Sequence, residues 1–147
     1  MPIDQLDWIR SRFHRCVEVV CDSSRTPHDI RVAIVDDARM RELHEQYKRD
    51  GSTTDVLTFD LRSDPGEALD VDLVVCLDEA RRQAADRGHD MTHELLLYSL
   101  HGLLHCVGYD DRDEEAARAM HRREDELLRE VGVGSVYGIS RGDGVSS

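Results

Sequence analysis

Apolar residues recur every three or four positions in several stretches of the chain, which is the spacing of one face of an α-helix. Leu6, Ile9, Phe13 and Val17 show this spacing near the N-terminus and predict a first helix. Capping residues and glycines near the ends of the periodic stretches set their limits. The pattern predicts helices over residues 4–21, 38–49, 78–87, 92–107 and 113–131.

Three shorter stretches have the composition of β-strands. Residues 30–35 place a branched apolar side chain at every second position, and residues 54–60 are rich in β-forming residues. Residues 69–76 are polar at the start and apolar at the end. The order helix, strand, helix, strand, strand, helix, helix, helix predicts the α+β class, with a small mixed β-sheet packed against several helices.

The length of 147 residues fits one domain with a single core. We expect this domain to span residues 1–131. Residues 132–147 are rich in glycine and serine, and we expect them to form a flexible C-terminal tail.

The most apolar segment, at 92–107, reads THELLLYSLHGLLHCV. It is apolar nearly all round, which predicts a central, buried helix. Thr92 is the expected N-cap of this helix, and His93 is expected to face solvent. We expect Gly108 to end the helix in the left-handed conformation.

Two histidines on this central helix carry the candidate chemistry. His101 and His105 are four positions apart, which places both imidazoles on one face, one turn apart. Helical pairs with this spacing bind zinc in many proteins. Histidine is also costly in an apolar helix unless its nitrogens are satisfied, and one shared ion would satisfy both side chains. The spacing therefore predicts a metal site on the central helix.

A third ligand is expected just after the helix. Because Gly108 allows the chain to turn back, the side chain of Asp111 can reach the same ion. Asp110 is a rival, since adjacent residues in an extended chain point in opposite directions. Three protein ligands leave a fourth position for water, which is the arrangement of catalytic zinc sites. The pKa of such a water falls toward ~7, so it becomes a nucleophile.

Two features keep other interpretations open. Asp111 could instead cap the next helix, because the N-terminus of a helix favours a negative charge nearby. Zinc proteases carry a glutamate directly after the first histidine as general base. Gly102 stands at that position here, so peptide hydrolysis is disfavoured.

The charge of the chain restricts its partners. The formal net charge is −12, so the average field repels nucleic acid, and a polyanionic substrate needs a local cation, a metal ion or a partner protein. The four cysteines form no C-x-x-C pair, which argues against a cysteine zinc site. No segment approaches the ~20 apolar residues of a membrane span, and the first residues do not have the pattern of a signal peptide. We expect a cytoplasmic protein without a membrane partner.

Several segments resemble one known family. The stretch HGLLHCVGYDD at 101–111 resembles the HGxLHLxGYDH signature of the YbeY family of endoribonucleases. The stretch YKRDGSTTDVLTFD at 47–60 resembles the family's YR…PTDVLSFP segment. The stretch LDVDLVVCLDEARRQA at 69–84 resembles its GDIvIs…A..QA segment, and the resemblance covers about residues 30–130.

The resemblance implies an α+β fold and one zinc ion per chain, with another divalent metal as the alternative. The family's first two metal-binding histidines fall on His101 and His105, and its third histidine falls on Asp111. Aspartate is a competent zinc ligand. It is also anionic, so we expect it to make the ion a weaker Lewis acid.

The resemblance also implies residues that act on the substrate. The family's functional arginine falls on Lys48, which keeps the charge but loses the bidentate phosphate contact, and Arg49 is expected to compensate. Lys48 and Arg49 are thus the predicted substrate-binding residues, and Lys48 would neutralise charge developing on a phosphate. Asp110, where it is not a ligand, is the second predicted catalytic residue, orienting the water or a histidine.

The implied activity is hydrolysis of phosphodiesters in ribosomal RNA, in its maturation and in ribosome quality control. The implied partners are ribosomal RNA, ribosomal proteins and the small ribosomal subunit, and no DNA is expected. Two other functions stay open. One is a non-enzymatic ribosome-assembly factor with a structural metal, which the net charge of −12 favours. The other is a different class of metallohydrolase.

Overall fold

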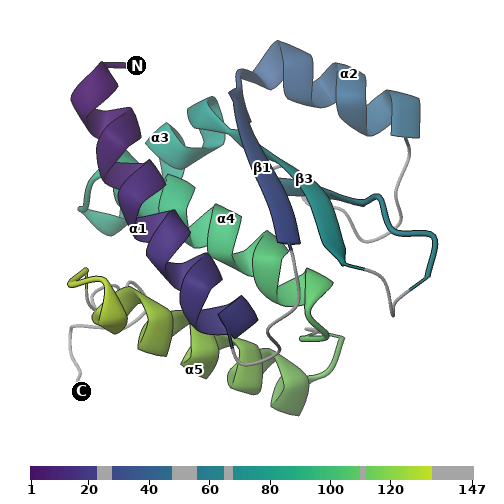
Figure 1. Cartoon of the computed structure of the whole chain (residues 1–147). Coiled ribbons are helices and arrows are strands. Elements are labelled where there is room, and N and C mark those ends of the chain that lie inside the picture. The colour runs from purple at the N-terminus through teal and green to yellow at the C-terminus, as the bar shows by residue number, and fades with distance from the viewer. Residues whose placement is uncertain (23–27, 48–55, 65–67, 110–111, 134–147) are drawn as a thin grey trace.

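The computed structural model describes residues 1–22, 28–47, 56–64, 68–109 and 112–133 (Figure 1). In these ranges three strands form one sheet: β1 (His28–Val35), β2 (Val56–Asp60) and β3 (Leu69–Cys76). The order is β1-β3-β2, with β1 parallel and β2 antiparallel to β3. The small mixed sheet predicted from the sequence is confirmed.

Five helices accompany the sheet in the described ranges, as the periodicity predicts. They are α1 (Ile3–Asp22), α2 (Asp37–Tyr47), α3 (Leu77–Arg87), α4 (Met91–Cys106) and α5 (Glu114–Glu130). Each described boundary lies within one residue of its prediction, except at the end of α2, where the residues that follow Tyr47 are outside the described ranges. In the described part of the chain, no helix is long and apolar enough to cross a membrane.

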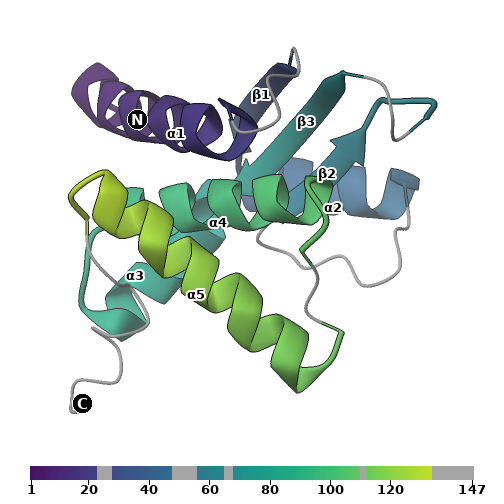
Figure 2. The same ribbon diagram turned by 60° about the horizontal axis from the view of Figure 1, so that its bottom comes forward.

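The second half of the central strand β3 is buried on both faces, which sets the layers of the fold. Leu73 belongs to the core that α1, α4 and α5 form on one face of the sheet. Val74, the next residue, packs with Met40 of α2 on the other face. Alternate side chains of a strand point to opposite faces, so β3 joins two apolar layers. Figure 2 shows α2 on the far side of the sheet from α4 and α5.

Helix α4 is the centre of the larger layer. Leu95, Leu96, Leu100, Leu103 and Leu104 each have 0% of their surface exposed, so the helix is buried nearly all round, as predicted. It contacts β2 and β3 of the sheet and the helices α1, α3 and α5 (Figures 1 and 2).

The start of α4 corrects two predictions. The N-cap is Asp90 rather than Thr92, because the chain at Asp90 is extended and its carbonyl oxygen already accepts from His93 N at 3.0 Å. His93 does not face solvent: its ring stacks on Trp8 of α1, with centroids 5.1 Å apart. The spacing of residues within one helix does not predict an aromatic contact with a helix that is distant in sequence.

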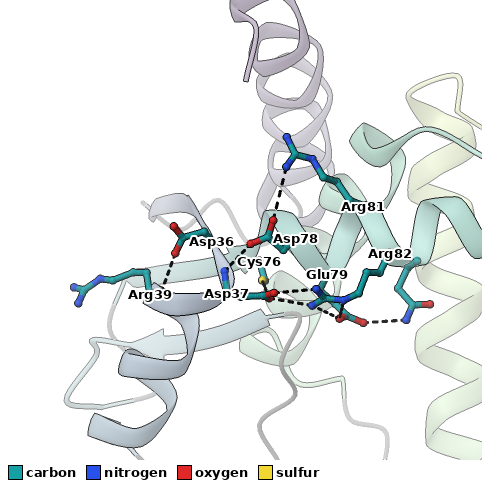
Figure 3. Close-up of polar contacts among 9 residues, drawn as sticks. Asp36, Asp37, Arg39, Cys76, Asp78, Glu79, Arg81 and Arg82 are labelled. Carbon is teal, nitrogen blue, oxygen red and sulfur yellow. Dashed lines mark hydrogen bonds and ion pairs between the residues drawn. The ribbon is translucent and has the colours of Figure 1, made fainter.

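An ion-pair network joins α2 to α3 on the side shown in Figure 3. Arg82 donates to both carboxylate oxygens of Asp37 at 2.9 Å, and to Glu79 at 2.8 Å. Asp78 in turn accepts from the backbone N of Asp37 at 2.8 Å. The Arg82 guanidinium lowers the pKa of Asp37 to about 2. These contacts fix the start of α2 against α3.

Candidate functional site

The C-terminal half of α4 carries the predicted histidine pair on one face. The Nε2 atoms of His101 and His105 are 3.2 Å apart, and the ring planes are at 80° with centroids 4.7 Å apart. The His101 side chain is 21% exposed, and His105 is exposed. The two Nε2 atoms therefore meet at the surface end of an otherwise buried helix.

A buried carboxylate supports this pair from behind. Glu124 of α5 is fully buried, and its Oε2 lies 2.9 Å from Nδ1 of His101. Because a carboxylate accepts, this contact favours the tautomer of His101 with its proton on Nδ1, which leaves the Nε2 lone pair directed toward His105. A ring oriented in this way by a carboxylate is typical of metal-binding histidines.

Glu124 was not among the residues predicted from the sequence, although a signal exists. Met120, Leu127 and Leu128 form the buried stripe of α5, and position 124 falls in the middle of that stripe. An acidic residue at a buried helical position needs a specific partner. That signal could have indicated the residue, but not that its partner is His101.

The turn after α4 has the geometry that the sequence predicts. Gly108 has φ +109°, in the region that favours glycine. Tyr109 N donates to Leu104 O at 2.9 Å, and Gly108 N donates to His105 O at 3.2 Å. These are the two hydrogen bonds of a Schellman motif, so the chain reverses direction directly after the second histidine.

Gly102 lies where α4 touches the sheet. A Cβ atom at this position would be 2.7 Å from Leu73 Cδ2 and 3.2 Å from Thr58 Oγ1. The position faces the strands, and only a residue without a side chain allows this approach. A glutamate at the position of the protease general base therefore has no room, which strengthens the argument against a peptidase.

The cysteine beside the pair belongs to the core. Cys106 packs against the apolar cluster of α1, α4 and α5. Burial, with a smaller contribution from the Asp60 carboxylate, raises the pKa of its thiol to about 12. The thiol therefore stays protonated at neutral pH.

The other predicted site residues are outside the described part of the chain. These are the predicted third ligand Asp111, its rival Asp110, and the substrate-binding residues Lys48 and Arg49. Among the described residues, no group of three His, Cys, Asp or Glu side chains is placed to hold a metal ion. The histidine pair, with Glu124 behind it, is the part of the site that the structure describes.

The fold and the site define a class of protein: a small α+β domain with an H-x3-H pair on its central helix and a carboxylate behind the first histidine. A family model described as Endoribonuclease YbeY matches residues 3–132. The chain belongs to this family.

Curated relatives agree with this assignment. A protein from Desulfitobacterium hafniense named Endoribonuclease YbeY is 36% identical over 114 residues, which cover 71% of this chain and 73% of that protein. One from Nostoc with the same name is 35% identical over 144 residues, covering 90% and 76% of the two chains. A solution structure of a protein from Thermotoga maritima has a TM-score of 0.58 at 23% identity, over 83% of both chains, and so shares the fold.

Proposed function

We propose that this protein is a zinc-dependent endoribonuclease that acts on ribosomal RNA, in its maturation and in ribosome quality control. The observation that carries the proposal is the convergence of two histidine nitrogens, backed by the buried Glu124, on the helix that bears the family's signature. The curated relatives are named endoribonucleases, which supports the same reaction class.

The distance between the two nitrogens fits a zinc ion. Two ligand nitrogens at about 2.0–2.1 Å from a tetrahedral zinc ion are about 3.3–3.4 Å apart. The Nε2 atoms of His101 and His105 are 3.2 Å apart. His101, His105 and Asp111 would hold the ion, with Asp110 as the alternative third ligand. Bound zinc supplies a Lewis acid that polarises a phosphoryl oxygen and lowers the pKa of a water molecule.

The protein's own groups have separate tasks in this proposal. Glu124 Oε2 holds the proton on Nδ1 of His101, which keeps the Nε2 lone pair directed outward. Lys48, with Arg49, would bind the RNA phosphate and neutralise the charge that develops on it. Asp110, where it is not a ligand, would orient the attacking water.

The net charge of the protein affects which form of RNA it can bind. At −12, the protein as a whole repels RNA, so free RNA should bind weakly. We therefore propose that the protein acts on RNA within the small ribosomal subunit, where basic ribosomal proteins compensate the repulsion. On this proposal the protein would act in the cytoplasm.

The test measures metal content and RNA cleavage in the same preparations. Purified wild-type protein should contain about one zinc ion per chain by mass spectrometry, and His105→Ala should contain almost none. The control is His14→Ala, since His14 is exposed on α1 and pairs only weakly with Glu18 at 3.8 Å. Asp111→Asn should also lose zinc if Asp111 is the third ligand.

Two further variants distinguish a residue that supports a metal ligand from a residue that acts on the RNA. Glu124→Gln should weaken zinc binding about 10–100-fold, with the exposed Glu126→Gln as control. Lys48→Ala should retain zinc and lose about a hundredfold or more in RNA cleavage rate. A wild type without metal after zinc loading would overturn the zinc site. A zinc-loaded protein that binds ribosomal subunits but never cuts RNA would instead indicate an assembly factor.

A further inference from the structure

Arg62, which follows β2, has a fixed orientation. Its Nε lies 2.9 Å from Asp60 Oδ1, and one of its terminal nitrogens lies 2.6 Å from Asp60 Oδ2. The backbone N of Arg62 also donates to Asp60 Oδ1, at 3.1 Å. Paired contacts between a guanidinium and a carboxylate restrict both distance and angle. Asp60 therefore sets the direction in which Arg62 points.

The direction is toward the end of α4. The terminal nitrogen of Arg62 that pairs with Asp60 also donates to the carbonyl oxygen of Cys106, at 3.2 Å. The last four carbonyl groups of a helix have no partner within the helix. The Schellman turn satisfies the carbonyls of Leu104 and His105. Arg62 supplies a donor to the next carbonyl in that series.

The electrostatics of this contact are favourable. A cation at the C-terminus of a helix is stabilised by the partial negative charge of the carbonyl groups there. The Arg62 side chain is only 16% exposed, so solvent and salt screen this interaction less than they would at the surface. The contact therefore restrains the last turn of α4.

The restrained carbonyl belongs to the residue directly after His105. Cys106 is also two residues before Gly108, where the chain turns, and five residues before Asp111. A shift of the last turn of α4 would move His105 and the start of that turn together. The restraint thus acts on the turn of helix that carries the second histidine of the pair.

We propose that Arg62, held in place by Asp60, is a positioning residue for the zinc site. It fixes the carbonyl of Cys106, and through it the orientation of His105 and of the turn at Gly108. This inference rests on the proposed zinc site. Arg62 touches neither the ion nor the substrate in this role. Its loss changes the affinity and the geometry of the site rather than its ligands.

The test compares Arg62→Met with Arg82→Met. Arg82 is a control because its guanidinium is likewise held in paired contacts, to Asp37 and Glu79, but lies between α2 and α3 (Figure 3). Zinc affinity is measured by competition with a chromophoric chelator, and the thermal midpoint of each metal-free variant is recorded alongside. The visible spectrum of the cobalt(II)-loaded protein reports the coordination geometry.

Arg62→Met should weaken zinc binding about tenfold and alter the cobalt spectrum, as supporting groups of metal ligands do. Arg82→Met should lower the thermal midpoint but leave zinc affinity within about twofold of wild type. Arg62→Lys, which keeps the charge without the paired geometry, should fall between wild type and Arg62→Met. If Arg62→Met does not fold, Arg62→Lys and Asp60→Asn carry the same comparison.

The measurements distinguish a failure of the positioning role from a failure of the proposed zinc site. If wild-type protein binds zinc and the Arg62 variants bind it equally well with an unchanged cobalt spectrum, the positioning role is overturned and the zinc site stands. If wild-type protein binds no zinc, the proposed site and this inference are both overturned.

Discussion

At the scale of single residues, the environment of Gly102 reverses the usual effect on stability of replacing a helical glycine with alanine. Alanine in place of glycine within a helix ordinarily stabilises a protein by about 1 kcal/mol. Here the added Cβ would lie 2.7 Å from Leu73 Cδ2 and 3.4 Å from Val56 Cγ2. Leu73 has 0% exposed surface, so its side chain cannot move into solvent to make room.

We therefore expect Gly102→Ala to destabilise the protein. Overpacking of a buried site costs about 1–3 kcal/mol, which exceeds the gain in helix propensity over most of that range. Chemical denaturation of the metal-free protein measures the change. The double variant Gly102→Ala/Leu73→Val lacks the clashing methyl group. Its loss of stability should therefore be smaller than the sum of the losses in the two single variants. A rise in stability for Gly102→Ala alone would mean that α4 can move away from the sheet at no cost.

At the scale of secondary-structure elements, α4 and α5 end in the same way. Gly108 has φ +109° and Gly132 has φ +80°. After α5, Val133 N donates to Leu128 O at 2.9 Å and Gly132 N donates to Arg129 O at 3.1 Å, which repeats the hydrogen bonds found after α4. One of these turns follows the histidine pair and the other does not, so each serves as a control for the other.

We expect Gly108→Ala and Gly132→Ala to cost similar amounts of stability, about 1–2 kcal/mol each, because alanine is strained at positive φ. Only Gly108→Ala should also weaken zinc binding, since only that turn leads from His105 toward the predicted acidic ligand. Urea denaturation and chelator competition on both variants measure the two effects. Equal zinc affinities in the two variants would show that the turn after α4 has no role in the site.

The elements also show what local sequence can and cannot predict. Strand β3 and helix α4 were predicted within one residue, because each contains a run of apolar residues with polar residues on either side of the element. His101 and His105 could be paired in advance, since helical spacing alone brings them together. Glu124 reaches His101 across 23 positions of sequence, and Arg62 reaches Cys106 across 44. Contacts of that range depend on how the helices and the sheet pack, which a single sequence pattern does not contain.

At the scale of the whole molecule, the core is independent of the proposed zinc ion. The leucines of α4 pack against the sheet on one side and against α1 and α5 on the others. His105 is exposed and His101 lies at the edge of this core, so the site is attached to a framework that is already complete. This differs from small zinc-finger domains, whose folding depends on the metal.

Removal of zinc should therefore leave the fold intact and reduce its stability. Binding to the folded state alone stabilises by about 2.7 kcal/mol when free zinc exceeds its dissociation constant a hundredfold. For a domain of this size, that corresponds to a shift of roughly 5–10 °C in the thermal midpoint. Calorimetry before and after dialysis against a chelator measures the shift, and far-ultraviolet circular dichroism should stay unchanged. Since His105→Ala removes the binding and not the framework, its midpoint should be insensitive to the chelator. Loss of helical signal on chelation would mean that the metal organises α4 itself, and that the leucine core is insufficient without it.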